Sequence, residues 1–289
     1  MRRSLTKKDE AVAGIVVAVM IVGLILAVIS IIQTIYIPNW MTTRESEHMG
    51  VVADQFSQFK FAVDTQIALK ETVPISTSIS LGSRELGFFM SNKAFGRLSI
   101  IPQGWSYEIL RKDGNTYQDY CGTLQYTSEN AYFLDQSYTY EIGGVVLNQT
   151  QGSVFSIKPD FTVAFNYSNP SYKNVTLTWT CVDLVPKGEK TSISGYGTYP
   201  VKTEYLLSPP PTNITNITKF TINTPFPTIW YNFLNTTFAD ANLVKTTHYT
   251  ITKTSNQVTV TFKYPPITNV VLKFEKISVV TEITPGWTE

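Results

Sequence analysis

The hydrophobic positions form three patterns that follow one another along the chain, and the first is an unbroken apolar run. From Ala11 to Ile32 the only polar side chain is Ser30, and no charge appears before Arg44. These 22 residues, as a helix rising about 1.5 Å per residue, would cover roughly the 30 Å of bilayer hydrocarbon. A soluble helix of this length would normally show a polar face. The pattern therefore predicts one membrane-spanning helix over residues 11–37.

The two flanks of this run predict its orientation. Four basic residues precede it: Arg2, Arg3, Lys7 and Lys8. Cationic flanks stay in the cytoplasm, and Tyr36 and Trp40 suit the aromatic belt of the opposite interface. No A-x-A-like site follows the apolar run, as it would in a cleavable secretory signal. We therefore expect a cytoplasmic leader over residues 1–10, membrane lipid around residues 11–37, and the rest of the chain outside the cell.

The second pattern is a stripe of apolar residues at helical spacing. Residues three or four apart repeat along it: Met49, Val52, Phe56, Phe59, Val63 and Ile67. This spacing predicts an amphipathic stalk helix over residues 38–70, and Pro38 should kink or end the helix before it. Glu45 and the other charged residues lie largely off the stripe, and we expect His48 on a solvated face. The partner of the stripe is either the chain's own globular domain or the same helix of a neighbouring subunit.

The third pattern consists of short β-type runs separated by turn residues, and it covers residues 75–289. Residues 249–253 and 258–264 predict one hairpin, and residues 138–147 and 153–157 suggest another. Further strands are expected at three places: 161–167, 175–182 and 270–283. Loops are expected at 208–211 and 225–227, and no helix-length pattern follows Leu69.

The predicted fold class is an N-terminal transmembrane α-helix that continues into an amphipathic helix, followed by an all-β, sandwich-like extracellular domain. The β region is long enough for a core of its own. Two sub-domains with a boundary near residue 208 and a single larger sandwich are both compatible with the pattern.

Sequons and cysteines are consistent with an exported β region. Six asparagines stand in Asn-x-Ser/Thr sites: Asn148, Asn166, Asn174, Asn213, Asn216 and Asn235. About three such sites would arise by chance in so Thr-rich a chain, so accidental sequons remain an alternative to glycosylation. Cys121 and Cys181 are expected to form a disulfide, which outside the cell would close a long loop. Two unlinked buried thiols are the alternative.

Composition excludes several classes of protein. The chain has 43% hydrophobic and 16% charged residues, a net charge of +1, two cysteines and two histidines. The near balance of positive and negative charge argues against a nucleic-acid partner. Two cysteines and two histidines are too few to favour a zinc or iron–sulfur site. His48 and His248 lie far apart in sequence, and no nucleophile elbow or phosphate loop is present. We expect no enzyme, no catalytic residue, no metal and no cofactor.

An aromatic cluster, Trp230-Tyr231-x-Phe233, is the remaining candidate for a binding surface. Core packing is its expected role, and sugar or subunit binding is the alternative.

The N-terminus resembles that of archaeal type IV pilin-like proteins. Residues 7–16, KKDEAVAGIV, are similar to the family's short charged segment and its AVSPVIG-like run, with Ala13-Gly14 in place of Ser-Pro. The continuation resembles a set of archaeal surface proteins with the same N-terminus. The resemblance rests there on Gln33, Pro38, the pair Glu47-His48 and the strand-like segment 79–83, and it covers about residues 7–100 in all.

This resemblance implies processing and assembly. A prepilin peptidase would remove the basic leader, and a secretion ATPase would polymerise the chain with copies of itself or related subunits. The processing region would be Lys7, Lys8, Glu10 and Ala11. The family's cut usually follows a small residue, often after a basic one, whereas here Glu10 precedes Ala11. An uncut chain would remain a single-pass anchored surface protein.

Small residues offer packing sites on the apolar helix. Gly14 with Ala18, and Gly23 with Ala27, are spaced four apart and would let helices approach closely, although such pairs are common in any apolar helix. We expect a structural, pilin-like subunit of an extracellular filament, located in the cell membrane and at the cell surface. The alternative is an anchored ectodomain that binds a ligand, a neighbouring cell or the S-layer without polymerising.

Overall fold

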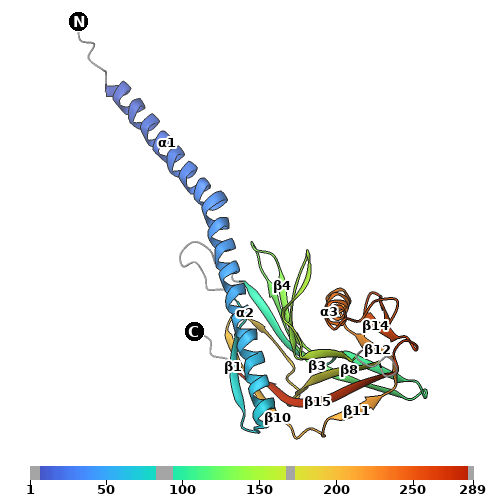
Figure 1. Ribbon diagram of the computed structural model, residues 1–289. Coiled ribbons are helices and arrows are strands. Elements are labelled where there is room, and N and C mark those ends of the chain that lie inside the picture. The colour runs from blue at the N-terminus through green and yellow to red at the C-terminus, as the bar shows by residue number, and fades with distance from the viewer. Residues whose placement is uncertain (1–6, 83–93, 167–172, 286–289) are drawn as a thin grey trace.

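The computed structural model describes residues 7–82, 94–166 and 173–285, as one long N-terminal helix and a β domain of two curled sheets (Figure 1). The helix consists of α1 (Lys7–Ile31), a π-helical turn (Ile32–Tyr36) and α2 (Ile37–Leu69). The predicted order of an apolar helix, an amphipathic helix and a β domain is confirmed. One helix in the β domain, described below, was not predicted.

Pro38 widens the helix instead of ending it. In the turn before it, the N–H of Ile37 donates to the carbonyl of Ile32, five residues earlier. A proline ring inside a helix collides with the carbonyl four residues earlier, and a widened π turn makes room for it. The helix changes direction here and continues as α2 (Figure 1). The expected kink is present, and the alternative of a helix end is wrong.

The two sheets contain six and nine strands among the described residues. In the first sheet the order is β1 (Ile75–Ser80), β10 (Thr198–Tyr205), β15 (Asn269–Ile283), β8 (Asn174–Pro186), β7 (Phe161–Asn166), with β11 (Thr212–Thr215) also on β15. In the second sheet the order is β13 (Tyr249–Lys253), β14 (Gln257–Phe262), β12 (Ile217–Asn223), β2 (Phe95–Arg111), β3 (Thr116–Glu129), β4 (Gln136–Glu141), β5 (Gly144–Gln149), β6 (Gly152–Ile157), with β9 (Ser192–Gly195) also on β2.

Strands from both sides of residue 208 share each sheet. β12 pairs with β2, and β15 pairs in parallel with β8 over the whole length of β8. The predicted hairpins are present as β13–β14 and β5–β6. Residues 138–147, taken as one run, form β4 and β5 with a turn between them.

A helix after Leu69 contradicts the sequence-based expectation. α3 (Pro227–Asp240) begins within the expected loop 225–227, with Pro227 in its first turn, where a missing N–H costs nothing. Its buried residues include Trp230, Leu234 and Phe238, spaced four apart. Aromatic residues favour strands slightly more than helices, so residue propensities did not predict α3. The helix is stabilised instead by the packing of its apolar face on the β domain.

The interior divides into two apolar clusters. One lies beneath α2 and the other beneath α3. The long strands cross both: Leu98 and Ile100 of β2 belong to the α2 cluster, and Tyr107 and Ile109 of the same strand belong to the α3 cluster. The β domain is therefore continuous between its two helices.

Glu141 is a fully buried carboxyl group near the N-terminal end of α3. The two-residue turn that follows it has positive φ at Ile142 (56°) and Gly143 (75°), as a tight hairpin between β4 and β5 requires. Thr224 Oγ1 and Trp230 Nε1 donate to Glu141 Oε1 at 2.6 and 2.7 Å. Burial raises the pKa of Glu141 to about 7, against the lowering effect of these two hydrogen bonds.

This carboxyl group makes stability depend on pH. Because its pKa is higher in the folded chain than in the unfolded one, its full contribution is present below about pH 4.5 and is lost as the pH rises through 7. Between pH 5 and pH 8, we expect the unfolding free energy of the wild-type chain to fall by about 2.5 kcal/mol relative to that of Glu141→Gln. Urea unfolding of both chains at a series of pH values measures the difference, and parallel profiles would contradict it.

Candidate functional site: the projecting helix and its attachment

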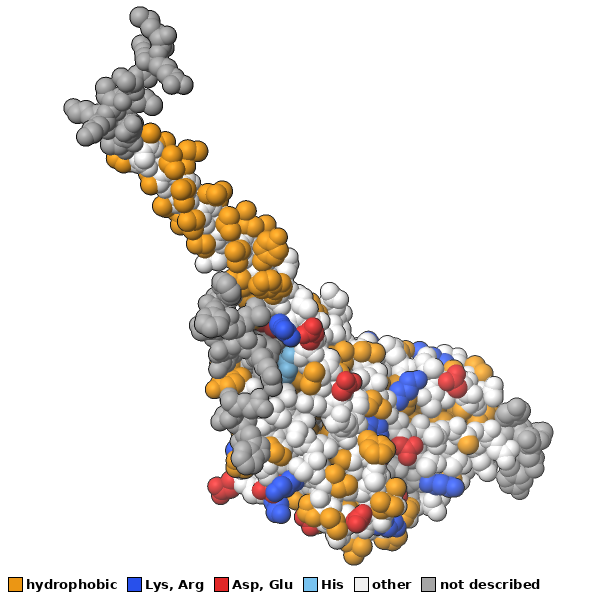
Figure 2. Space-filling view, turned by 90° about the vertical axis from the view of Figure 1, so that its left-hand side faces the viewer, with side chains coloured by type: hydrophobic (Ala, Val, Ile, Leu, Met, Phe, Trp, Pro, Cys, Tyr) orange, Lys and Arg blue, Asp and Glu red, His pale blue; other side chains and the backbone are white. Residues whose placement is uncertain are grey.

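α1 is an apolar rod that the β domain leaves uncovered (Figure 2). Every side chain from Val12 to Ile31 is exposed, and the large hydrophobic ones have 44 to 69% of their area accessible. Among the described residues, Val12–Leu69 is the one helix long and apolar enough to cross a membrane, with a mean hydropathy of 3.3 in its apolar stretch. A membrane anchor and an N-terminal signal sequence both have this form.

The small residues of α1 lie on two opposite faces. Gly14 and Gly23 are nine residues apart, which at about 100° per residue is half a turn beyond two full turns. Ala18 and Ala27 follow each glycine on its own face. A Cβ atom placed on Gly14 or Gly23 would meet nothing within 4 Å. Both faces are open, and their role in helix packing stays a prediction.

The processing region coincides with the start of this helix. Lys7, Lys8, Glu10 and Ala11 lie in the first turns of α1. Residues 1–6 of the predicted leader, and Ser83 of the strand-like segment 79–83, lie outside the described residues.

The apolar stripe of α2 packs on the chain's own β domain. Its predicted residues from Met49 to Val63 are at most 2% exposed. Phe56 lies against Tyr138 and Phe59 against Tyr140, with ring centroids 5.7 and 5.3 Å apart. Of the two partners considered for the stripe, the structure shows the globular domain.

Glu45 belongs to this stripe, contrary to the expectation that it lies off it. It stands four residues before Met49 on the same helix face and is 0% exposed. Its carboxylate accepts the backbone N–H groups of Ala131, Tyr132 and Phe133 at 3.0, 2.8 and 2.6 Å. Three hydrogen bonds to one charged acceptor offset its burial and fix α2 to the loop between β3 and β4.

Two more polar residues of α2 are buried against the sheets. His48, expected on a solvated face, is 8% exposed, and its Nε2 lies 3.3 Å from the hydroxyl of Tyr126. Burial lowers the pKa of His48, so the ring is neutral at pH 7. At the far end of the helix, Gln66 Nε2 donates to the carbonyls of Val73 and Thr203 at 2.9 and 2.8 Å.

The predicted cysteine pair lies between the two sheets. Cys121 of β3 and Cys181 of β8 are fully buried, with their sulfur atoms 3.1 Å apart as two free thiols. Burial raises the pKa of the Cys181 thiol, which disfavours a reactive thiolate. The pairing brings together two residues 60 positions apart, and the disulfide itself stays a prediction.

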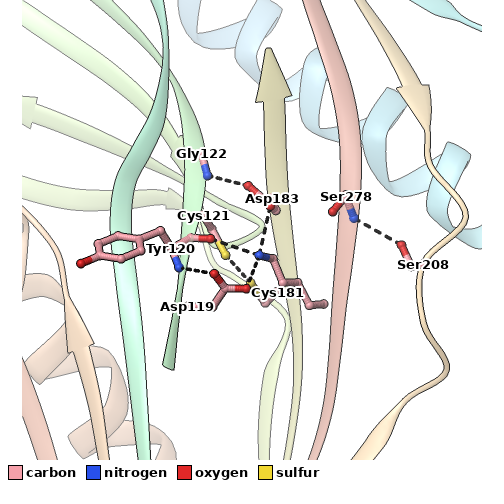
Figure 3. Close-up of polar contacts among 9 residues, drawn as sticks. Asp119, Tyr120, Cys121, Gly122, Cys181, Asp183, Ser208 and Ser278 are labelled. Atoms are coloured by element: carbon pink, nitrogen blue, oxygen red, sulfur yellow. Dashed lines mark hydrogen bonds and ion pairs between the residues drawn. The ribbon is translucent and has the colours of Figure 1, made fainter. Parts of the chain in front are cut away.

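Lys276 of β15 joins the same two sheets. Its two partners, Asp119 and Asp183, lie beside Cys121 and Cys181 (Figure 3). Its Nζ lies 2.6 Å from Asp119 Oδ2 on β3 and 3.2 Å from Asp183 Oδ2 on β8. Burial alone would lower the pKa of Lys276, but the hydrogen bond to Asp119 and the nearby negative charges raise it overall. The ammonium therefore stays charged and holds the two carboxylates together.

The sequon asparagines are accessible to different degrees. Exposed side chains belong to Asn166, Asn213 and Asn216, and partly exposed ones to Asn148, Asn174 and Asn235. Two of the partly exposed side chains are hydrogen-bonded: Asn148 Oδ1 accepts Ser153 Oγ, and Asn235 Oδ1 accepts Tyr249 OH. No sequon asparagine is buried, and glycosylation stays a prediction.

The remaining candidates do not form a catalytic or metal site among the described residues. No group of three or more His, Cys, Asp or Glu side chains there could hold a metal ion. Trp230 lies in the core, as the aromatic pattern predicted. The ring of His248 lies against Phe165, with centroids 5.0 Å apart, and its Nδ1 accepts the N–H of Val244.

Comparison with protein families, with curated proteins and with solved structures finds no match to this chain.

The attachment of α2 can be tested at Glu45. We expect Glu45→Ala to lower the free energy of unfolding by about 2 to 3 kcal/mol, because three N–H groups lose a charged acceptor. The matched control is Glu47→Ala, which removes an exposed carboxylate paired with Arg44 and should change stability by less than about 0.5 kcal/mol. Urea unfolding of the full chain in detergent measures both, and equal effects would contradict the assignment.

The cysteine pair gives a second test. We expect the exported chain to resist alkylation under denaturing, non-reducing conditions, and reductant to lower its stability by up to about 4 kcal/mol. The double variant Cys121→Ser/Cys181→Ser should be insensitive to reductant. Alkylation of both cysteines without reductant would refute the disulfide.

Proposed function

We propose that this chain is a structural cell-surface protein: a pilin-like subunit, of the archaeal type IV kind, of an extracellular filament. The single observation that carries the proposal is the uncovered apolar helix α1, which continues into an α2 fixed to the β domain. α1 would form the filament core with copies of itself or related subunits, and the β domain would face outward.

The same surface of α1 suits membrane and filament in turn. Leaving a Val, Leu or Ile side chain in water costs about 2 kcal/mol relative to burial. Lipid removes this cost before assembly, and neighbouring α1 helices would remove it afterwards. The exposed stretch Val12–Ile31 carries no charge, so either apolar environment accepts it. The two opposite small-residue faces would admit a neighbour on each side.

A single-pass anchored ectodomain is the second candidate. The observation that favours it is Glu10 immediately before Ala11, because a leader that is not cut would keep α1 in the membrane. In that case the β domain would bind a ligand, a neighbouring cell or the S-layer without polymerising.

Close approach of α1 helices is the property that separates the two candidates. In cells that produce the protein, Gly14→Leu/Gly23→Leu keeps α1 apolar but fills both small-residue faces. We expect the variant chain to remain in the membrane fraction while filaments disappear from sheared surface material. Val17→Leu/Leu26→Ile, an apolar exchange on the intervening faces, should leave filaments intact.

The mature N-terminus provides the cheapest measurement on the same cells. Mass spectrometry should show loss of the basic leader if the chain is processed as a pilin. An intact Met1 together with no filaments would favour the anchored ectodomain. Full-length chain in the cytosol, with both thiols reduced, would overturn both candidates.

A further inference from the structure

The surface of the β domain around α3 carries a local excess of lysine. It is built from α3, β13 and β14, on the opposite side of the domain from α2 (Figure 1). Residues 205–268 contain four lysines and a single acidic residue, Asp240. The whole chain has a net charge of only +1, so positive charge is concentrated in this segment.

Two of the lysines meet at one tyrosine. The ammonium groups of Lys245 and Lys253 lie 5.1 and 5.7 Å from the centre of the Tyr231 ring. Lys245 also donates to the Tyr231 hydroxyl at 2.7 Å, and Lys253 donates to Thr228 Oγ1 at 3.0 Å. Both ammonium groups therefore lie within 6 Å of the centre of one ring, whose electron-rich face attracts cations.

Two further lysines lie near the loop before β13: Lys263 of the same segment and Lys173 from an earlier part of the chain. Lys263 Nζ donates to the carbonyl of Thr246, next to Lys245. Lys173 lies near enough to His248 to reinforce the lowering of its pKa, which burial begins. We call the four residues, Lys173, Lys245, Lys253 and Lys263, the lysine platform.

No carboxylate among the described residues neutralises the platform. None of its four ammonium groups lies within 4.0 Å of one, whereas Lys60, Lys187 and Lys276 each pair with Asp or Glu. The ammonium contacts named above are to neutral oxygens and an aromatic ring. Lys245, Lys253 and Lys263 are exposed, so their charge faces solvent and is available to an anionic partner.

We propose that the lysine platform binds an acidic polysaccharide, through carboxylate or sulfate groups spaced along an extended chain. Lysines are point charges on flexible stems and tolerate varied anion geometry, as a polymer with irregular contacts requires. The platform contains no arginine for bidentate phosphate recognition, and the Tyr231 ring already carries two cations instead of offering a free face to a base. These features favour a polysaccharide over a nucleic acid.

Position also argues for a partner outside the cell. α3 and β14 lie on the side of the β domain away from α2 (Figure 1), so the platform does not adjoin the helix that a membrane would hold. In the filament of the proposed function, the platform would lie on the outer surface. The binding itself requires only the folded β domain, so it does not depend on polymerisation.

The test uses the full chain in non-ionic detergent, produced in a host that attaches no N-linked sugar. Immobilised polygalacturonate, dextran sulfate and neutral dextran serve as carboxylate, sulfate and uncharged probes. We expect binding to one or both acidic polymers and none to dextran, weakening about tenfold or more when NaCl rises from about 50 to about 200 mM. The relative strength of the two acidic probes identifies the anion.

Matched variants separate the platform from net charge. Lys245→Gln/Lys253→Gln/Lys263→Gln should weaken binding at least about tenfold. The control, Lys187→Gln/Lys190→Gln/Lys202→Gln, removes the same charge elsewhere and should stay within about twofold. Thermal unfolding checks that both variants fold. Equal losses in the two variants, no binding by the wild-type chain, or tighter binding to duplex DNA than to either acidic polymer would overturn the proposal.

Discussion

The exposed apolar surface of α1 is the constraint on which the rest of the molecule depends. About twenty consecutive side chains cannot remain in water, because each large aliphatic one would cost about 2 kcal/mol there. The chain's own β domain does not cover them, so lipid or another chain must. Whatever surrounds α1 also restricts the position of α2, because the two helices are continuous. α2 therefore determines how the β domain is presented to its surroundings.

Polar contacts, more than the apolar stripe, define how α2 sits on the sheets. A stripe with residues three and four apart looks much the same after a shift of one turn, so apolar contacts alone set the register weakly. Glu45 near the start of α2 and Gln66 near its end each need particular backbone partners. A shift of one turn would leave these buried groups unsatisfied, which is costly. The two ends together hold the helix in a single position.

The sequence predicted the elements whose periodicity is long and undisturbed, and missed those decided by contacts distant in sequence. The apolar run and the stripe from Met49 to Val63 gave both N-terminal helices correctly. Glu45 lay at a stripe position, but its charge suggested solvent, and its three N–H partners are more than eighty residues away. α3 was hidden by its aromatic residues. Lys276 shows no local signal at all, because its two aspartates lie on other strands.

The cysteine pair and Lys276 lie where the two apolar clusters meet, and both lie between the sheets. Lys276 of β15 forms an ion pair with Asp119 of β3, and the sulfur atoms of Cys121 on β3 and Cys181 on β8 are 3.1 Å apart. Along β8, Cys181 belongs to the α3 cluster and Val182 to the α2 cluster. On β15, Phe274 and Ile277 flank Lys276 and divide between the clusters in the same way. The ion pair of Lys276, together with the predicted disulfide, would hold the two sheets to each other at the junction of the α2 and α3 clusters.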